Sequence, residues 1–288
     1  MSKIGFDVLA WSAGASEDLL PIMDRLKRIG YDGVEFFIGS AEIADYKRLG
    51  KHANEIGLGV TAVTVLGAEE NLIDPSPAVR AKGLDRMKWT IDRCNDLNAE
   101  ILCGPLHSAF GTFAQHAPEE REYEWSAEIL HQAGEYASQT DLILTPEALN
   151  RFECYLCNTM QQLKYLIEKV DHPNVKAMFD THHANIEEKN FGKAISTIAP
   201  VLGHVHISEN DRGTPGEGHV PWEETFSSLA EIDYQGWYTI EGFTRNDIAF
   251  ANSIYVWREF AQPWDMAEKG FEFIRKMIKK YACKLNVE

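Results

Sequence analysis

The sequence lacks several features that would place it in a familiar class. No apolar run approaches the about 18 residues that a membrane span needs. No G-x-G-x-x-G or Walker A motif follows the first apolar segment, so the usual sequence signatures of nucleotide binding are absent. The five cysteines are an odd number scattered along the chain and do not form a disulfide framework. We therefore expect neither a membrane protein nor a small disulfide-stabilised fold.

Basic residues are also scarce. The chain has 28 Lys and Arg against 44 Asp and Glu, a formal net charge of −16. Such a surface repels phosphate backbones and anionic lipids, so we expect no nucleic acid and no membrane as partners. The residues from Met1 to Asp7 show no apolar signal-peptide core, from which we expect a cytoplasmic protein. The hydrophobic fraction of 44% is that of an ordinary globular chain with a large core.

One unit recurs along the chain: a short apolar run, a connection, and a longer amphipathic stretch. Most of the runs are near-continuous in apolar residues, which is typical of strands buried on both faces of a parallel sheet. The eight predicted strands are Ile4–Leu9, Gly33–Phe37, Gly59–Val65, Ile101–Cys103, Leu142–Thr145, Val175–Phe179, His204–Ile207 and Trp237–Ile240.

Helical periodicity separates these runs. The predicted helices are Glu17–Ile29, Ala41–Ile56, Ala78–Leu97, Glu119–Ser138, Thr159–Val170, Phe191–Ala199, Trp222–Ile232 and Met266–Tyr281. Eight strand–helix units predict an α/β fold, a (β/α)8 TIM barrel that forms a single domain over residues 1–288. A doubly wound open sheet is the alternative, and eight repeats without a second domain disfavour it. Long loops at Pro105–Pro118, Ser208–Pro221 and Gly242–Asp265 fall after strands, on the side where barrels build active sites.

Polar residues end four consecutive predicted strands. Glu147, Asp180, His206 and Glu241 are separated by 33, 26 and 35 residues, each about one strand–helix unit. Three carboxylates and an imidazole that converge unpaired in a barrel mouth would be destabilised by desolvation and repulsion. A divalent cation resolves this conflict, and the donor set suits Mn²⁺, Mg²⁺ or Co²⁺, while Zn²⁺ stays open. We expect the deeper His204 to be a hydrogen-bonded interior histidine.

Four sequence blocks resemble the ketose 3-epimerases, which include the D-tagatose, D-psicose (allulose) and L-ribulose 3-epimerases of the xylose-isomerase-like barrel superfamily. The blocks are Glu147-Ala-Leu-Asn-Arg-Phe-Glu153 with Leu156-Cys-Asn-Thr159; Asp180-Thr-His-His-Ala-Asn-Ile-Glu-Glu188; Gly203-His-Val-His206 running on to Arg212; and Pro215-Gly-Glu-Gly218, Pro221-Trp222 and Ile240-Glu241-Gly-Phe243. The resemblance is strongest over residues 147–243.

The resemblance implies a fold, a reaction and roles for residues. It implies Glu147, Asp180, His206 and Glu241 as metal ligands, most simply for Mn²⁺. Substrate contacts near O1 and O2 of a ketose are implied for Glu153, His183 and Arg212. It also implies a homodimer or homotetramer.

Epimerisation at C3 requires one base on each face of that carbon, because a proton leaves one face and returns to the other. Glu147 and Glu241 are the candidates for this acid–base pair. Charge that moves onto the C2 oxygen forms an enediolate, which a bound cation stabilises.

The chain departs from the family pattern at several positions. His182 and Ala184 stand where the family usually has Phe and Met, and Gly242 stands where it has Pro. Asp7 lies where the family tends to place an aromatic side chain facing the far end of the sugar. If Asp7 faces the site, we expect a more polar distal end of the substrate. These departures leave the preferred sugar open.

Other readings share the same site. A related proton-transfer enzyme, such as an aldose–ketose isomerase, an inosose dehydratase or isomerase, or a deglycosidase of 3-keto sugars, would exchange the proton of a different carbon. A sugar-binding protein would bind without exchange. Apurinic endonucleases also use this fold, but they need a basic groove, and the net charge of −16 argues against one.

Overall fold

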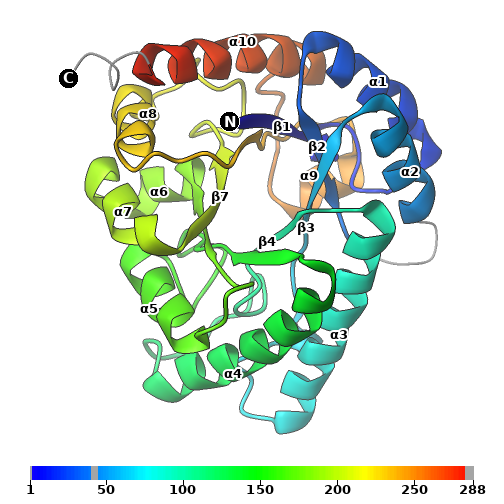
Figure 1. Cartoon of the computed structure of the whole chain (residues 1–288). Coiled ribbons are helices and arrows are strands. Elements are labelled where there is room, and N and C mark those ends of the chain that lie inside the picture. The colour runs from blue at the N-terminus through cyan, green and yellow to red at the C-terminus, as the bar shows by residue number, and fades with distance from the viewer. Residues whose placement is uncertain (1, 40–44, 283–288) are drawn as a thin grey trace.

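Eight parallel strands form the centre of the molecule, and helices surround them (Figure 1). The computed structural model describes residues 2–39 and 45–282. The strands are β1 (Lys3–Asp7), β2 (Gly33–Phe37), β3 (Gly59–Val63), β4 (Ile101–Gly104), β5 (Ile143–Pro146), β6 (Ala177–Asp180), β7 (Leu202–Ile207) and β8 (Trp237–Ile240). Each of the eight matches a predicted strand.

The sheet closes on itself. Hydrogen-bonded neighbours follow the order β5-β4-β3-β2-β1-β8-β7-β6. Parallel bridges between Leu144 and Val175 and between Glu147 and Met178 join β5 to β6. The predicted (β/α)8 barrel is therefore confirmed, and the open doubly wound sheet is excluded.

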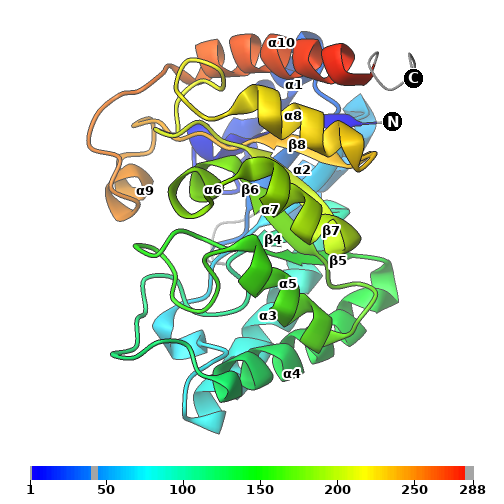
Figure 2. The same cartoon turned by 90° about the vertical axis from the view of Figure 1, so that its left-hand side faces the viewer.

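The described α-helices are α1 (Leu20–Ile29), α2 (Tyr46–Ile56), α3 (Pro77–Leu97), α4 (Glu120–Ala137), α5 (Met160–Val170), α6 (Thr181–Glu187), α7 (Phe191–Ile198), α8 (Trp222–Glu231), α9 (Ile248–Ser253) and α10 (Pro263–Ala282). Eight of them agree with the predicted helices to within a few residues over the described part of the chain, whereas α6 and α9 were not predicted. The short helices α6 and α9 lie at one end of the barrel (Figure 2), inside segments that follow β6 and β8. In the described part of the chain, no helix has both the length and the apolar content of a membrane span.

Helix boundaries follow local chemistry. The stretch predicted from Glu17 begins as a 3-10 turn, and α1 starts at Leu20 because Pro21 is tolerated only in the first helical turn. Asp45 caps α2 by accepting a hydrogen bond from the Arg48 N–H, so the helix starts at Tyr46. Residues 41–44 of the predicted helix Ala41–Ile56 lie outside the described residues.

Two glycines leave room for a tryptophan ring at the end of the barrel where the strands begin. Gly33 and Gly59 are register partners at the starts of β2 and β3. A Cβ added at Gly33 would lie 2.4 Å from the ring of Trp237, and one at Gly59 would lie 2.8 Å from it. The buried Trp237 thus fills this end, which leaves the opposite end, where the strands finish, for a site.

Candidate active site

The four strand-end residues converge in the barrel mouth. Glu147 directly follows β5, Asp180 ends β6, His206 lies in β7 and Glu241 directly follows β8, and all four are buried. His206 Nδ1 lies 3.5 Å from Glu241 Oε2 and 3.7 Å from Asp180 Oδ2. One donor atom from each of Glu147, Asp180 and His206 lies within 4.8 Å of the others. The convergence expected from the spacing is present, while the role of each residue stays a prediction.

Two atoms of this cluster are unsatisfied. Glu147 Oε1 and His206 Nδ1 are buried without a hydrogen-bond partner, whereas buried polar atoms in proteins are nearly always paired. Carboxylate oxygens and an imidazole nitrogen are donors that a divalent cation accepts. The orphaned atoms and the donor set therefore fit a bound metal ion.

A glutamate that the sequence analysis missed holds His206 in place. Glu35, fully buried in β2, accepts hydrogen bonds from His206 Nε2 at 2.6 Å and His204 Nε2 at 3.1 Å. Thr61 Oγ1 donates to the same carboxylate at 2.7 Å. Because Nε2 of His206 is committed to Glu35, Nδ1 is left facing Asp180 and Glu241. His204 is the hydrogen-bonded interior histidine that was expected.

The carboxylates of the cluster differ in their electrostatics. Burial, together with Asp180 and Glu241, raises the pKa of Glu147 well above its ordinary value. Burial also opposes ionisation of Asp180 and Glu241, but the charges of Arg212 and His206, with smaller contributions from other neighbours, together outweigh it and lower both pKa values. Repulsion in the cluster is therefore concentrated on Glu147.

Arg212 joins the predicted substrate contacts to this cluster. Its Nη1 pairs with Glu241 Oε2 and lies 3.4 Å from Asp180 Oδ2, and its Nη2 lies 3.0 Å from His183 Nε2. Burial and the charge of Arg212 hold the pKa of His183 well below its ordinary value. The ring is therefore neutral, and its Nε2 lies 3.6 Å from Glu147 Oε1.

Asn150, a second residue that the sequence analysis missed, connects His183 to Glu153. Its backbone N–H donates to His183 Nδ1 at 3.1 Å, and its side-chain amide donates to Glu153 Oε1 at 2.9 Å. The three residues predicted to contact substrate, Glu153, His183 and Arg212, thus lie together beside the cluster. The sequence signal for Asn150 was its position inside the block Glu147–Glu153 that carries the family resemblance. The sequence signal for Glu35 was a single charged residue in the apolar run Gly33–Phe37.

A cavity of about 540 Å³ opens above the cluster. Glu147 and Glu241 line it, whereas Asp180 and His206 are not among its lining residues and lie behind them. Asp7 does not line it either. The condition under which a more polar distal end of the substrate was expected is therefore not met, because the chain turns after β1 and Leu9 lines the cavity instead.

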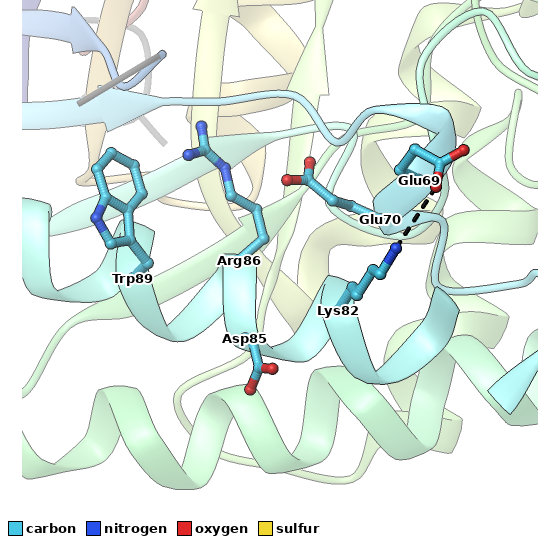
Figure 3. A pocket seen from close by; sticks show the side chains of 6 residues that line it. All are labelled: Glu69, Glu70, Lys82, Asp85, Arg86 and Trp89. Carbon is cyan, nitrogen blue, oxygen red and sulfur yellow. Dashed lines mark ion pairs between the residues drawn. The ribbon is translucent and has the colours of Figure 1, made fainter. Parts of the chain in front are cut away.

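A second hollow on the outside of the barrel is of a different kind. It lies beside α3 and is lined by Glu69, Glu70, Lys82, Asp85, Arg86 and Trp89 (Figure 3). Its basic side chains already have partners within the protein: Lys82 pairs with Glu69 at 3.6 Å, and Arg86 donates a hydrogen bond to the carbonyl of Gly39 at 2.6 Å. It is far more open than the barrel mouth and brings together no cluster of possible metal ligands among the described residues.

Comparisons with known proteins agree with this geometry. The family model described as "Xylose isomerase-like TIM barrel" matches residues 23–277. The chain is 31% identical over 270 residues to the D-psicose 3-epimerase of Agrobacterium fabrum, covering 92% of this chain and 93% of that protein. It is also 31% identical over 290 residues to the D-psicose 3-epimerase of Ruminiclostridium cellulolyticum, covering 96% and 98%.

Solved structures show the same likeness. A structure of an L-ribulose 3-epimerase superposes with a TM-score of 0.93 at 29% identity, covering 100% of this chain and 98% of that one. The match spans the barrel and the strand ends that build the site. The chain therefore belongs to the xylose isomerase-like TIM-barrel family and, within it, to the ketose 3-epimerases.

Proposed function

We propose that the protein is a metal-dependent ketose 3-epimerase that interconverts C3 epimers of free ketoses. One observation carries the proposal. Of the four converging strand-end residues, Glu147 and Glu241 line the cavity, and they come from strands separated by β6 and β7. Two carboxylates that reach one cavity from different sides suit a reaction that removes a proton from one face of C3 and returns it to the other.

The residues would divide the work as follows. Glu147, Asp180, His206 and Glu241 would hold the cation, for which we propose Mn²⁺. When bound, the cation supplies positive charge that stabilises the enediolate formed from the ketose. Glu147 and Glu241 exchange the C3 proton, and the handedness of the substrate at C3 decides which of them takes it. Arg212 and His183 bind near the C2 oxygen, where the guanidinium opposes the negative charge that develops there.

The test follows individual hydrogen atoms by proton NMR in D₂O. The metal-stripped protein is reloaded with Mn²⁺, cleared of excess ion and given D-psicose, D-fructose, D-tagatose and L-ribulose. The proposal predicts deuterium at C3 together with growth of the 3-epimer. Deuterium at C1 with an aldose product would make the protein an aldose–ketose isomerase, and tight binding without exchange would make it a binding protein.

Single variants sharpen this test. In Glu147→Gln the remaining carboxylate can exchange the C3 hydrogen of one epimer, but it cannot invert C3. We therefore expect exchange without epimerisation for that epimer, and the reverse preference in Glu241→Gln. Glu217→Gln is the matched control, because this exposed glutamate pairs with Lys269 outside the cavity and should behave as wild type. Epimerisation by Glu147→Gln at the wild-type rate would contradict the assignment.

The compartment and the assembly stay predictions. We propose a cytoplasmic homodimer or homotetramer, on the strength of the family resemblance. Light scattering on the purified protein tests the assembly directly. A monomer at micromolar concentration would contradict it without affecting the proposed chemistry.

A further inference from the structure

The two glutamates proposed as bases are held in the barrel mouth by different means. Glu241 Oε2 pairs with Nη1 of Arg212, so its carboxylate is fixed by a side chain. Among residues 2–39 and 45–282, no group donates a hydrogen bond to the carboxylate of Glu147, whose Oε1 is buried without a partner. His183 Nε2 lies 3.6 Å from this oxygen, beyond hydrogen-bond distance. Apart from the proposed cation, the backbone of Glu147 alone sets where its carboxylate lies.

One segment binds both polar groups of the Glu147 backbone. It is the segment 104–111, which begins at the end of β4 and continues beyond it. The Glu147 N–H donates a hydrogen bond to the Gly104 carbonyl at 2.8 Å, and Nε2 of His107 lies 2.9 Å from the Glu147 carbonyl oxygen. A carbonyl oxygen only accepts hydrogen bonds, so Nε2 carries a proton and donates it. The segment therefore holds Glu147 at both of its peptide groups.

His107 is itself fixed in place, and it does not line the cavity. The residue is fully buried and is not among the residues around the cavity. Its Nδ1 lies 3.0 Å from Ser108 Oγ, and its carbonyl accepts a hydrogen bond from Ser126 Oγ of α4 at 2.8 Å. Ser108 Oγ in turn lies 3.2 Å from Cys154 Sγ. A ring that is locked in this way, and that does not touch the sugar, acts on the reaction through Glu147.

Other hydrogen bonds keep the two segments together when the His107 bond is lost. The Gly111 N–H donates to the Glu153 carbonyl at 2.9 Å, and the bond from the Glu147 N–H to Gly104 remains. A change at His107 should therefore displace the Glu147 carbonyl and its side chain without releasing the connection after β5. A displacement of about 1 Å at a reacting group can lower a rate about 100-fold.

We propose that His107 is a positioning residue for Glu147, and that the hydrogen bond from Nε2 to the Glu147 carbonyl aims the carboxylate at one face of C3. The inference rests on the proposed function, in which Glu147 and Glu241 serve opposite faces. It makes the two faces unequal: loss of the bond weakens proton transfer by Glu147, whereas Glu241 keeps its contact with Arg212. A generally loosened site would instead weaken proton transfer on both faces.

Two amide variants separate the two nitrogens of the His107 ring. The amide nitrogen of glutamine reaches the place of Nε2 and can donate to the Glu147 carbonyl, whereas the shorter asparagine reaches only the place of Nδ1. His107→Gln therefore keeps the bond that the proposal requires, and His107→Asn loses it while still placing a polar group beside Ser108. His131→Leu is the matched control, because His131 Nδ1 donates to the carbonyl of Val170 at 2.8 Å and His131 does not line the cavity.

The assay is proton NMR in D₂O at saturating Mn²⁺, with D-psicose and D-fructose given separately. One of these C3 epimers presents its C3 proton to Glu147 and the other presents it to Glu241. In His107→Asn we expect kcat for the first epimer to fall at least about tenfold, with KM changed less than about twofold. The second epimer should still take up deuterium at C3 but should invert less, so its ratio of exchange to epimerisation should rise at least about fivefold.

His107→Gln and His131→Leu should keep the wild-type ratio of exchange to epimerisation. Equal losses of exchange and inversion for both sugars in His107→Asn would indicate a general structural effect and would overturn the inference. A wild-type ratio in His107→Asn would overturn it as well.

Mn²⁺ binding gives a readout that does not depend on turnover. Because Glu147 is also a proposed ligand, calorimetry should show Mn²⁺ binding at least about tenfold weaker in His107→Asn than in His107→Gln. That difference, found together with no C3 exchange of any ketose by the wild type, would support the positioning role and contradict the epimerase. C3 exchange by the wild type, with His107→Asn and His107→Gln alike in Kd and in exchange ratio, would do the reverse.

Discussion

Replacement of a carboxyl group by its amide should change the stability of the protein by different amounts at two buried positions on neighbouring strands. Asp7 in β1 and Glu35 in β2 are register partners, and both are fully buried. Burial opposes the charge of Glu35, but His206 and His204 hold its pKa well below the ordinary value. Burial and the nearby charge of Glu35 raise the pKa of Asp7 well above its ordinary value. The surroundings thus favour the ionised form of Glu35 and the neutral form of Asp7.

The variants Glu35→Gln and Asp7→Asn test this difference. Glutamine removes the charge that pairs with the two histidines, and loss of one partner of a buried pair costs about 3–5 kcal/mol. Asp7 Oδ1 accepts one hydrogen bond from the Leu9 N–H at 2.8 Å, and its Oδ2 has no partner. An asparagine amide reproduces the neutral acid, so we expect a change of less than about 1 kcal/mol.

The assay is thermal unfolding followed by circular dichroism in EDTA, which removes any contribution from bound metal. The expected loss lowers the Tm of Glu35→Gln by about 10 °C and leaves that of Asp7→Asn nearly unchanged. Glu35→Gln should also weaken Mn²⁺ binding about 10- to 100-fold by calorimetry, because Glu35 orients the ring of His206. Equal Tm losses in the two variants would refute the assignment of the charge to Glu35.

Three further predictions follow from the site and its surroundings. Glu147→Gln should lower the rate of epimerisation at least about 100-fold with an unchanged circular dichroism spectrum, since it removes one member of the proposed acid–base pair; a rate within threefold of wild type would contradict its role. Removal of metal with EDTA should lower the Tm, and Mn²⁺ at 100 times its Kd should restore about 2.7 kcal/mol, whereas no change in Tm would count against a metal site. Burial lowers the pKa of His107 to about 4 from 6.5, so its neutral form contributes stability that is complete above pH 6.5 and is lost as the pH falls toward 4. His107→Gln should therefore lose about 3 kcal/mol less than wild type over that interval, measured by urea unfolding, and parallel pH curves would contradict this.

The fold could be predicted from the sequence because its signal is local and repeated. Each buried strand, such as Gly59–Val63, is a short apolar run, and each helix has a recognisable period. The short helix α9 was not predicted, and the residue that caps it contacts a distant segment of the chain. Its N-cap residue Asp247 accepts a hydrogen bond from the Ala13 N–H, 234 residues away.

Part of the candidate site could also be predicted from the sequence, and part of it could not. Glu147, Asp180, His206 and Glu241 could be found because parallel strands end at one rim, so their spacing alone predicts convergence. Glu35 could not be assigned in this way, since its role depends on His204 and His206 of β7, a strand that is not its neighbour in the sheet. The apolar lining of the cavity could not be predicted either, because residues such as Phe110 and Ile254 lie far apart in the sequence and line one cavity only in the folded chain.

The central claim is that this site moves a proton at C3 of a ketose. The most direct test is proton NMR of the Mn²⁺-loaded protein with D-psicose in D₂O. The account predicts deuterium at C3 alone, with the 3-epimer appearing alongside it and no incorporation at C1. Incorporation at C1 with an aldose product, or no incorporation at any carbon of any ketose tested, would contradict it.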